Sequence, residues 1–468
     1  MQRRKKLTWA ALGATLLAAG MIMPMAHAQT SDALLDKLVD KGYLTVKEAN
    51  ELREQADDGF QKAYQARTGL PDWVNQVKLY GDVRGRMELF RFENDALGAG
   101  EPNKDRTRYR YRLRVGATVQ MKNNFELGFR LTSSEAQGTF GGDPISGNTT
   151  AQDNGSKKFV YVDAAYGKWT PISSGPWLLS GTIGKMENPF VVSDMVFDAD
   201  YTPEGGAMQL GYAINADHSL KLNGGVFILD EINQGATASE DPYMLGVQLR
   251  YDAKWSPQLS TTAGIGWYGV VHDQTLNNAN VPNVNVGNTR YNAAVPGLHA
   301  AGDIVNSYHP VVADLGVTYT VEKVPMYPGP FPIRLAGEVM HNPGADDDNN
   351  AYWAGIFFGK SGKKGTWEVS YRYKRLEADA WFEEFVDSDF GAYYQTGSTP
   401  AGFGQGAGYR AGTGVKGHVM KAAYSVSDSF TFGITYFLTD LIDPKIVASG
   451  DHFESGQHRV QIDAVWKF

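Results

Sequence analysis

Arginines at every second position are the side chains best suited to chemistry in this sequence. Five of them lie in one segment, where they alternate with Thr, Tyr, Leu and Val; they are Arg106, Arg108, Arg110, Arg112 and Arg114. A helical period of 3.6 would scatter these arginines around a helix, whereas a strand period of 2.0 gathers them on one face. Arg84 and Arg86 follow the same pattern in the preceding segment, so a hairpin would bring seven guanidinium groups together. This surface would attract anions, unless internal salt bridges neutralise it.

The segments that position such side chains repeat the same alternation along most of the chain. We predict sixteen strands, which begin near residues 76, 105, 124, 158, 177, 205, 218, 242, 258, 309, 330, 350, 364, 415, 429 and 457. Short turns are predicted at 122–124, around Pro171, and at 215–217, 256–257 and 361–363. Long loops are predicted at 92–104, 136–157, 188–204, 272–308, 378–414 and 440–456. Short turns on one rim, long loops on the other and an even strand count are typical of a bacterial outer-membrane β-barrel.

The bilayer explains this pattern, because hydrocarbon offers no hydrogen-bond partners and a spanning sheet must close on itself. We therefore expect the apolar face of each strand to contact lipid and the polar face to line a lumen. In a barrel of about 16 strands this lumen is a water-filled channel, unless it is plugged. Aromatic residues near strand ends are candidates for the girdles at the headgroups; they are Tyr80, Trp169, Trp177, Trp267 and Trp466.

The composition fits this class of protein. Of 468 residues, 42% are hydrophobic, which is low for a helical membrane protein and is what strands with one polar and one apolar face predict. The formal net charge of −8 disfavours a dedicated nucleic-acid binder. The absence of cysteine excludes disulfide scaffolds, thiolate metal sites and cysteine nucleophiles.

Residues 1–28 have the pattern of a cleaved signal peptide. A basic start precedes an apolar stretch, and Ala26, His27 and Ala28 supply the small-x-small cleavage pattern. We predict that the mature chain begins at Gln29 and is exported to the outer membrane of a Gram-negative bacterium. Beyond the signal there is no run of about 20 apolar residues, so we predict no transmembrane helix.

Residues 29–72 have helical rather than strand periodicity. Gly42 fits the end of a first helix, and Thr45 with Glu48 fits a capping box that opens a second one. We predict a short periplasmic helical segment, followed by the barrel over residues 73–468. Whether this segment is a solvated linker or an element that self-associates or meets the cell wall stays open.

The last predicted strand carries the strongest single signal. Its outward positions are Val460, Ile462, Ala464, Trp466 and Phe468. This pattern resembles the terminal aromatic signature that outer-membrane proteins present to the barrel-assembly machinery. We therefore predict that Trp466 and Phe468 act as an assembly signal.

Three stretches of the sequence together carry a resemblance to a known family. They are the helical stretch from Leu34 to Arg53, the run Gly184-Lys185-Met186-Glu187-Asn188-Pro189-Phe190 and the terminal Phe468. With them, the chain resembles the putative porin family of Gram-negative outer membranes over essentially all of the mature sequence. The resemblance implies a diffusion channel, and it brings no catalytic residue and no established substrate.

The predicted architecture also resembles the sixteen-stranded general porins, in which the third outer loop folds inward and narrows the channel. The corresponding loop here contains the carboxylates Asp194, Asp198, Asp200 and Glu204. The resemblance implies that these carboxylates face the arginines across a constriction, where the field between them would orient dipolar solutes. The alternative is a simple surface loop.

The favoured function is passive diffusion of small hydrophilic solutes, with a preference for anions if the arginines line the narrowest part. We expect no enzymatic activity, no metal site and no cofactor. The expected partners are outer-membrane lipid, the barrel-assembly machinery, the solutes and further copies in a homotrimer, but not nucleic acid. Two alternatives stay open: a structural or adhesive barrel plugged by its 272–308 and 397–414 loops, and a barrel-borne hydrolase with a Ser–His pair on two strands.

Overall fold

The computed structural model describes most residues from 69 onward and a few before them. The described residues are 39, 45, 48–52, 69–93, 105–136, 141–232, 240–277, 279–283, 286–291, 294–296, 298–391, 393–394, 409–410, 412–443 and 454–468. The chain divides into two compact units, Met1–Trp73 and Val74–Phe468, and each is described by itself.

In the first unit, a capping box precedes helical backbone at 48–52. The Thr45 N–H donates to Glu48 Oε2 at 2.8 Å, and the Glu48 N–H donates to Thr45 Oγ1 at 3.2 Å. These reciprocal bonds confirm the predicted motif. The predicted signal peptide, 1–28, and most of the predicted first helix lie outside the described residues. Within the described part of the chain, no helix is long and apolar enough to cross a membrane.

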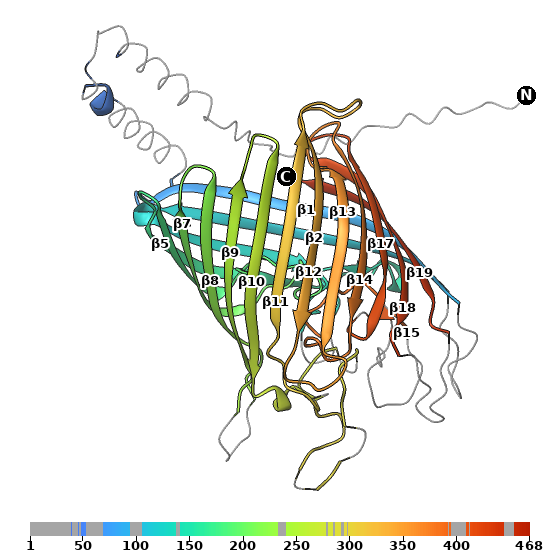
Figure 1. Cartoon of the computed structure of the whole chain (residues 1–468). Helices are drawn as coiled ribbons and strands as arrows, with labels where there is room; N and C mark the ends of the chain where they lie inside the picture. Colours follow the sequence, from blue (N-terminus) through green and yellow to red (C-terminus); the bar gives the residue numbers. More distant parts are fainter. Residues whose placement is uncertain are drawn as a thin grey trace, which may run out of the picture. The chain divides into compact units, whose positions relative to one another are not determined.

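The second unit is a closed antiparallel barrel of sixteen long strands (Figure 1). The strands are β1 (Val74–Phe92), β2 (Arg106–Met121), β3 (Phe125–Ser133), β5 (Val160–Ile172), β6 (Trp177–Lys185), β7 (Glu204–Ala213), β8 (His218–Ile228), β9 (Tyr243–Lys254), β10 (Leu259–Val271), β11 (Val311–Val321), β12 (Phe331–His341), β13 (Asn350–Gly359), β14 (Trp367–Leu376), β17 (Val415–Ser425), β18 (Phe430–Leu441) and β19 (Gln457–Lys467). Each long strand pairs with the next, and β1 pairs with both β2 and β19, so the sheet closes. Closure satisfies the backbone groups that lipid cannot. The predicted sixteen-strand barrel is confirmed, and every predicted strand start lies within three residues of the observed one.

Short elements complete the connections. They are η1 (Lys122–Asn124), β4 (Thr149–Thr150), η2 (Asp153–Gly155), η3 (Asp273–Thr275), β15 (Tyr393–Tyr394) and β16 (Tyr409–Arg410). In η1, both Asn123 and Asn124 have a φ of 60°, a left-handed conformation that Asn adopts more readily than most residues. The two-residue β4 pairs with β2, and an element of that length shows no periodicity in a sequence.

The turn predicted around Pro171 is wrong. Strand β5 continues to Ile172, and the turn follows at 173–176. The pairing of β5 with β6 is irregular between Trp169 and Ile172. Proline lacks an N–H and is tolerated where the ladder is interrupted, so this irregularity explains how Pro171 can lie inside a strand.

Alternate strand residues face lipid and lumen. On β2, Leu113 and Val115 are 37% and 41% exposed, whereas Arg112 is 6% exposed. We call the end of the barrel with the short turns the short-turn rim and the other end the long-loop rim. Three outward aromatic pairs lie near the short-turn rim; they are Phe125–Trp169, Trp177–Tyr212 and Phe430–Trp466, with ring centroids 5.6, 4.4 and 4.6 Å apart. Their position fits an aromatic girdle.

Tyr80 does not belong to this girdle. A Cβ added to Gly116 of β2 would lie 2.6 Å from the Tyr80 ring, and Gly116 shares the strand face of Arg112 and Arg114. Tyr80 therefore faces the lumen. Its place in the alternation, on the face of Asp82, indicates the same orientation, and proximity to a strand end was the weaker criterion.

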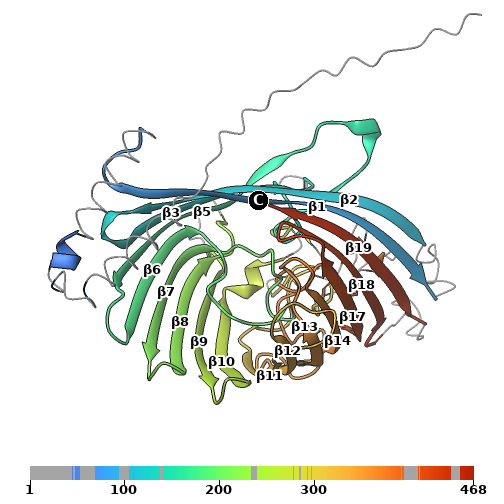
Figure 2. The same cartoon turned by 90° about the horizontal axis from the view of Figure 1, so that it is seen from above.

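The lumen contains an apolar core, which the expectation of a polar lumen did not include. Viewed along the barrel, connecting segments lie inside the ring of strands (Figure 2). Buried side chains of β8 to β13 pack there against loop residues. Large members of this core include Phe190, Phe197, Phe227, Met244, Tyr268, Tyr308, Trp353, Trp381, Phe382 and Phe385. The expectation that the face toward the lumen is polar therefore fails at these positions, because inward loops cover their apolar residues.

Candidate functional site: the charged lumen

Seven arginines of β1 and β2 line one wall of the lumen. We call them the arginine ladder: Arg84, Arg86, Arg106, Arg108, Arg110, Arg112 and Arg114. In the antiparallel register, Arg84 is opposite Arg112 and Arg86 is opposite Arg110. Like charges directly across a strand pair repel each other, so this register requires carboxylates nearby.

Carboxylates from other strands and loops supply much of that compensation. Arg86 Nε and Nη2 donate to the two carboxylate oxygens of Asp463 on β19, at 2.7 and 2.9 Å, and Arg86 Nη1 donates to Asp389 at 2.8 Å. Arg108 Nε donates to Glu88 at 2.6 Å. Such charge-assisted bonds fix the guanidinium planes. The ladder is therefore an ion-paired network over much of its length rather than a bare cationic wall.

The other ladder members differ in their partners. Arg84 Nη2 donates to the side-chain oxygen of Asn148 at 2.7 Å. Arg110 lies 3.9 Å from the Glu88 carboxylate. Arg106 is the first residue of β2 and lies at the long-loop rim.

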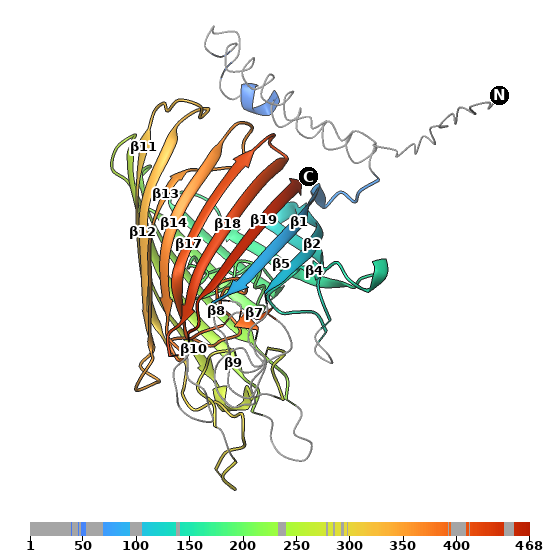
Figure 3. The same ribbon diagram turned by 90° about the vertical axis from the view of Figure 1, so that its right-hand side faces the viewer.

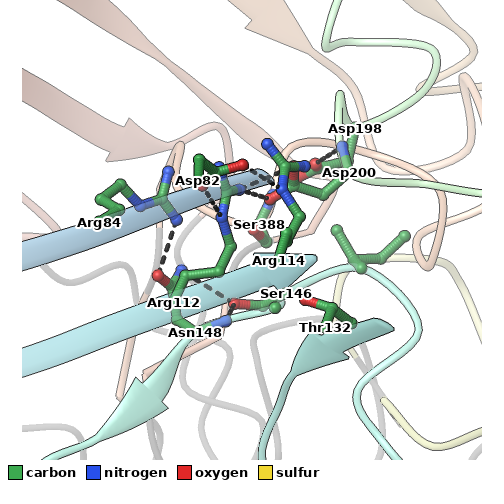
Figure 4. A network of polar contacts seen from close by, with 12 residues as sticks. Asp82, Arg84, Arg112, Arg114, Thr132, Ser146, Asn148, Asp198, Asp200 and Ser388 are labelled. Carbon is green, nitrogen blue, oxygen red and sulfur yellow. Dashed lines mark hydrogen bonds and ion pairs between the residues drawn. The ribbon is translucent and has the colours of Figure 1, made fainter. Parts of the chain in front are cut away.

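The third outer loop, residues 186–203, folds into the lumen and reaches the ladder. Arg112 Nη1 donates to Asp200 Oδ2 at 2.7 Å, and Arg114 Nη1 donates to Asp200 Oδ1 at 3.1 Å. Asp82 of β1 accepts bonds from the same two arginines, at 3.0 and 2.6 Å (Figure 4). Two guanidinium groups thus lie between a strand carboxylate and a loop carboxylate.

Asp194 anchors the same loop to β14 instead of to the ladder. Its carboxylate pairs with Arg372 at 2.9 Å and with Lys374 at 3.0 Å. Burial favours the neutral acid, but these two cations hold the pKa of Asp194 well below its ordinary value. Asp194 is therefore a structural anchor of the loop.

Asp198 also points away from the ladder. Its two carboxylate oxygens accept the backbone N–H groups of Asp200 and Ser388, at 2.8 and 2.9 Å (Figure 4). Burial, together with the nearby carboxylates of Asp200 and Asp387, raises the pKa of Asp198 well above its ordinary value. Of the predicted constriction carboxylates, Asp200 makes the contacts with the ladder, and Asp198 connects two loops.

Glu204 is not a loop residue facing the arginines. It is the first residue of β7, and its carboxylate pairs with Lys185 of β6 at 2.9 Å. The Glu204 side chain is 64% exposed, and it lies on the strand face of Met208, which is 61% exposed. The strand begins one residue earlier than predicted, and this places Glu204 on the outer face.

A second inward segment, residues 377–391, was not predicted, because it belongs to a connection that looked like an ordinary outer loop. Asp387 accepts a bond from Lys374 Nζ at 3.0 Å, and Asp389 accepts one from Arg459 Nη2 at 2.8 Å. The signal in the sequence was the aromatic density of the run from 381 to 385, which is unusual for a solvated loop.

The two inward segments bond directly to each other. The Asp198 N–H donates to the Phe385 carbonyl at 2.7 Å, and the Asp387 N–H donates to the Asp194 carbonyl at 2.9 Å. The buried indole of Trp381 donates to the Val196 carbonyl at 2.8 Å. These bonds and the apolar core join the two segments into one body inside the barrel.

The fifth outer loop, between β10 and β11, covers this body. Arg290 Nη2 donates to Glu383 Oε1 at 2.7 Å, and both side chains are completely buried. Asn288 Nδ2 donates to the Trp381 carbonyl at 2.8 Å. A buried ion pair is strongly destabilised when one partner is lost, so this contact fastens the fifth loop to the inward segments.

A cavity of about 510 Å³ lies in the lumen. Most of its lining residues belong to β13, β14, β17, β18, β19 and β1, which lie side by side in the barrel wall (Figure 3). Gly362 and Lys467 place one end at the short-turn rim, and Asp387 and Asp389 place the other end against the inward segments. Its charged lining residues are Arg84, Arg86, Arg112, Asp194, Glu368, Arg372, Asp387, Asp389, Lys421, Asp463 and Lys467. The cavity is thus a polar chamber that extends from the rim to the ladder.

The last residue completes the wall. The Phe468 N–H donates to the Gly81 carbonyl at 3.1 Å, and the Gly81 N–H donates to the Phe468 carbonyl at 3.0 Å. The Phe468 and Trp466 side chains are 64% and 48% exposed on the outer face. Their role as an assembly signal stays a prediction. Within the described residues, no group of three or more His, Cys, Asp or Glu side chains could hold a metal ion.

Comparison with known proteins gives a match to one porin family. The profile of the family described as Putative porin matches residues 95–315, which confirms the predicted resemblance. No curated protein matches the sequence. The chain is thus a closed β-barrel that is similar, over residues 95–315, to the porins of outer membranes.

Three solved structures are similar to this chain. OprB from Pseudomonas putida, in a high-pH structure, is 9% identical, with 88% of this chain and 97% of that chain covered and a TM-score of 0.49. OmpF from Salmonella typhi, in complex with daunomycin, is 10% identical, with 84% and 98% covered and a TM-score of 0.44. A triple mutant of the Rhodopseudomonas blastica porin is 11% identical, with 84% and 100% covered and a TM-score of 0.39.

Proposed function

Because the chain matches the putative porin family, we propose that it is a channel for the passive diffusion of small hydrophilic solutes, with a preference for anions. The observation that carries this proposal is the polar cavity inside a closed barrel, which extends from the short-turn rim to the arginine ladder. A passage lined by charged and polar groups replaces part of a solute's hydration shell, whereas an apolar constriction would dewet.

The proposed anion preference depends on where charge lies rather than on how much there is. The chain as a whole carries a formal charge of −8, but screening at physiological salt weakens interactions beyond about 8 Å. The charged lining of the cavity contains six basic and five acidic side chains. Local charge along the solute's path is therefore slightly positive, in contrast to the overall balance.

A second candidate is a structural barrel with a plugged lumen. The observation that favours it is the body formed by the third loop and residues 377–391, whose aromatic core fills part of the lumen. The fifth loop, which the sequence analysis named as a plug, covers this body through the pair Arg290–Glu383. Ion flow separates the two candidates, because only a channel conducts.

Planar-bilayer recording of the purified full-length protein in a salt gradient tests the proposal. We expect stable conductance steps and a reversal potential on the anion-selective side. Replacing both Arg110 and Arg112 with Gln should move the reversal potential toward cations, because the ladder loses two positive charges while the nearby carboxylates of Glu88, Asp82 and Asp200 stay. A silent bilayer would favour the plugged barrel, and conductance with cation selectivity would remove the anion preference while keeping the channel.

A further inference from the structure

Two members of the arginine ladder lack the close carboxylate that others have. Four ladder residues each lie within 2.7 Å of a carboxylate oxygen; they are Arg86, Arg108, Arg112 and Arg114. Among the described residues, no carboxylate oxygen lies within 4.0 Å of Arg84, whose partner is the neutral amide of Asn148 at 2.7 Å. Arg110 donates to Ser146 Oγ and to the Asn148 carbonyl, both at a long 3.4 Å.

Buried donors of these two arginines are also unused. In the part of the chain that the structure describes, Arg84 Nε, Arg110 Nε and Thr149 Oγ1 are buried and form no hydrogen bond. Both arginines donate to Asn148, so they share one partner in the lumen, whereas Thr149 is opposite Tyr111 in the strand register and its side chain belongs to the outward face. Leaving a buried polar group without a partner is unfavourable, which makes these two side chains unusual in a ladder that is otherwise well bonded.

We infer that Arg84 and Arg110 form a binding site for the carboxylate group of a solute in transit. This inference rests on the proposed channel function and names the class of solute. The Nε–H and Nη–H groups of a guanidinium form a planar fork that matches the two oxygens of a carboxylate. Arg84 lines the polar cavity and Arg110 is not among its lining residues, so a solute that enters from the short-turn rim meets Arg84 first, and the buried Nε–H of Arg84 becomes available to it when the side chain shifts.

The neutral partner explains why the site would suit transport. A carboxylate at the position of Asn148 would occupy Arg84 permanently, as Asp463 occupies Arg86. An amide instead orients the guanidinium and leaves its charge available. Conduction requires binding that is strong enough for entry and weak enough for release, and an arginine held by an amide meets both conditions.

Calorimetric titration of the full-length protein in detergent tests the site without any need for conductance. Sodium succinate is the probe, and sodium chloride at equal ionic strength is the reference. We expect saturable binding of succinate, weakened about tenfold by Arg84→Gln, which corresponds to about 1.4 kcal/mol. Arg84→Lys should weaken it similarly, because lysine keeps the charge but lacks the fork.

Two further variants control the experiment. Lys421→Gln removes one positive charge from the same cavity, where Lys421 is paired with Glu368 at 2.6 Å, and it should bind succinate like the wild type. Asn148→Asp places a carboxylate beside Arg84 without removing an arginine, and it should abolish binding if the site is as described.

The outcomes distinguish the site from the channel. Equal affinity for succinate in the wild type, Arg84→Gln and Asn148→Asp would overturn the site. Chloride that binds with the same affinity as succinate would also overturn it. Succinate binding that depends on Arg84 supports the site even if bilayers stay silent, in which case the diffusion function fails alone. Conductance without such binding would support the channel function and contradict the proposed carboxylate site.

Discussion

The protonation of the Glu384 carboxyl group reports on the packing of the second inward segment. Glu384 lies next to Glu383, and its Oε1 accepts the Asn283 N–H at 2.5 Å. Burial, with the neighbouring Glu383 carboxylate, raises the pKa of Glu384 to about 8. Since an unfolded glutamate has a pKa of about 4.3, the folded protein keeps a proton that the unfolded chain releases at lower pH.

This difference predicts a pH-dependent stability. Below about pH 4 both states are protonated, and as the pH rises from about 4 to 8 only the unfolded chain ionises, so the wild type loses stability across this window. Glu384→Gln keeps an Oε1 acceptor and cannot ionise, so it should be more stable than the wild type by roughly 1–3 kcal/mol at pH 8 and nearly equal at pH 4. Thermal unfolding followed by circular dichroism at several pH values measures the difference.

Glu383→Gln is the matched control. Because Glu383 is paired with the buried Arg290, its loss should destabilise the protein throughout the neutral range rather than flatten the pH profile. A Glu384→Gln protein with the same pH slope as the wild type would contradict the assignment of the slope to Glu384.

For single residues, the sequence shows on which face of a strand a side chain lies, but it does not show with which residue that side chain pairs. Alternation alone placed the ladder arginines on the lumen side. It could not identify the partner of Arg86, because Asp463 lies 377 positions along the chain and only barrel closure brings it near. Asp200 was selected with Asp194, Asp198 and Glu204 as one acidic group, and their different contacts depend on loop packing that no period encodes.

The last strand shows how one element closes the barrel. The backbone of Phe468 bonds to Gly81, while its ring is exposed on the outer face. We expect Phe468→Ala to keep both backbone bonds and to change stability by less than about 1 kcal/mol, yet to slow insertion into the outer membrane. Pulse-chase measurement of the folded, heat-modifiable form gives the rate.

A second exposed apolar side chain at the same rim provides the comparison. Val426, in the turn between β17 and β18, is 50% exposed, and Val426→Ala should insert at the wild-type rate. If Phe468→Ala also did so, the terminal aromatic would be incidental in this chain.

The second inward segment is an element whose removal should widen the channel. Residues 380–387 contribute Trp381, Phe382 and Phe385 to the core, but they add no strand to the barrel. Replacing these eight residues with a Gly-Ser sequence of equal length should lower stability, because Arg290 loses Glu383, but it leaves all sixteen strands in place and should raise the unitary conductance. The same replacement at 151–158, which is mostly exposed, should leave the conductance unchanged. Equal conductance in both variants would show that the inward segment does not limit ion flow.

Strands and inward segments differ in how far a sequence specifies them. Lipid on one side and a polar lumen on the other impose a period of two on every spanning strand, so the strand starts were predictable to within three residues. The inward segments obey no such rule. They are held by bonds such as Asp198 N–H to the Phe385 carbonyl, between residues that have no pattern in common.

The whole barrel has an even number of strands, so the chain enters the first strand and leaves the last strand at the same rim. Strand β1 begins and β19 ends at the short-turn rim, and the long loops lie at the other end. In outer-membrane barrels the short turns are periplasmic and the long loops extracellular. The orientation predicted from this rule places Asp347, in the loop between β12 and β13, outside the cell and Ala216, in the turn between β7 and β8, in the periplasm.

The chain offers a direct way to test this orientation, because it contains no cysteine. A single cysteine at either exposed position, Asp347→Cys or Ala216→Cys, would be the only thiol of the protein. We expect a maleimide attached to a polymer too large to pass the channel to label Asp347→Cys on intact cells. The same reagent should label Ala216→Cys only after the outer membrane is permeabilised, since the bilayer then no longer separates it from the short-turn rim. Labelling of Ala216→Cys on intact cells, with Asp347→Cys protected, would invert the barrel, and the cavity at the short-turn rim would then be the entrance from outside rather than the exit into the periplasm.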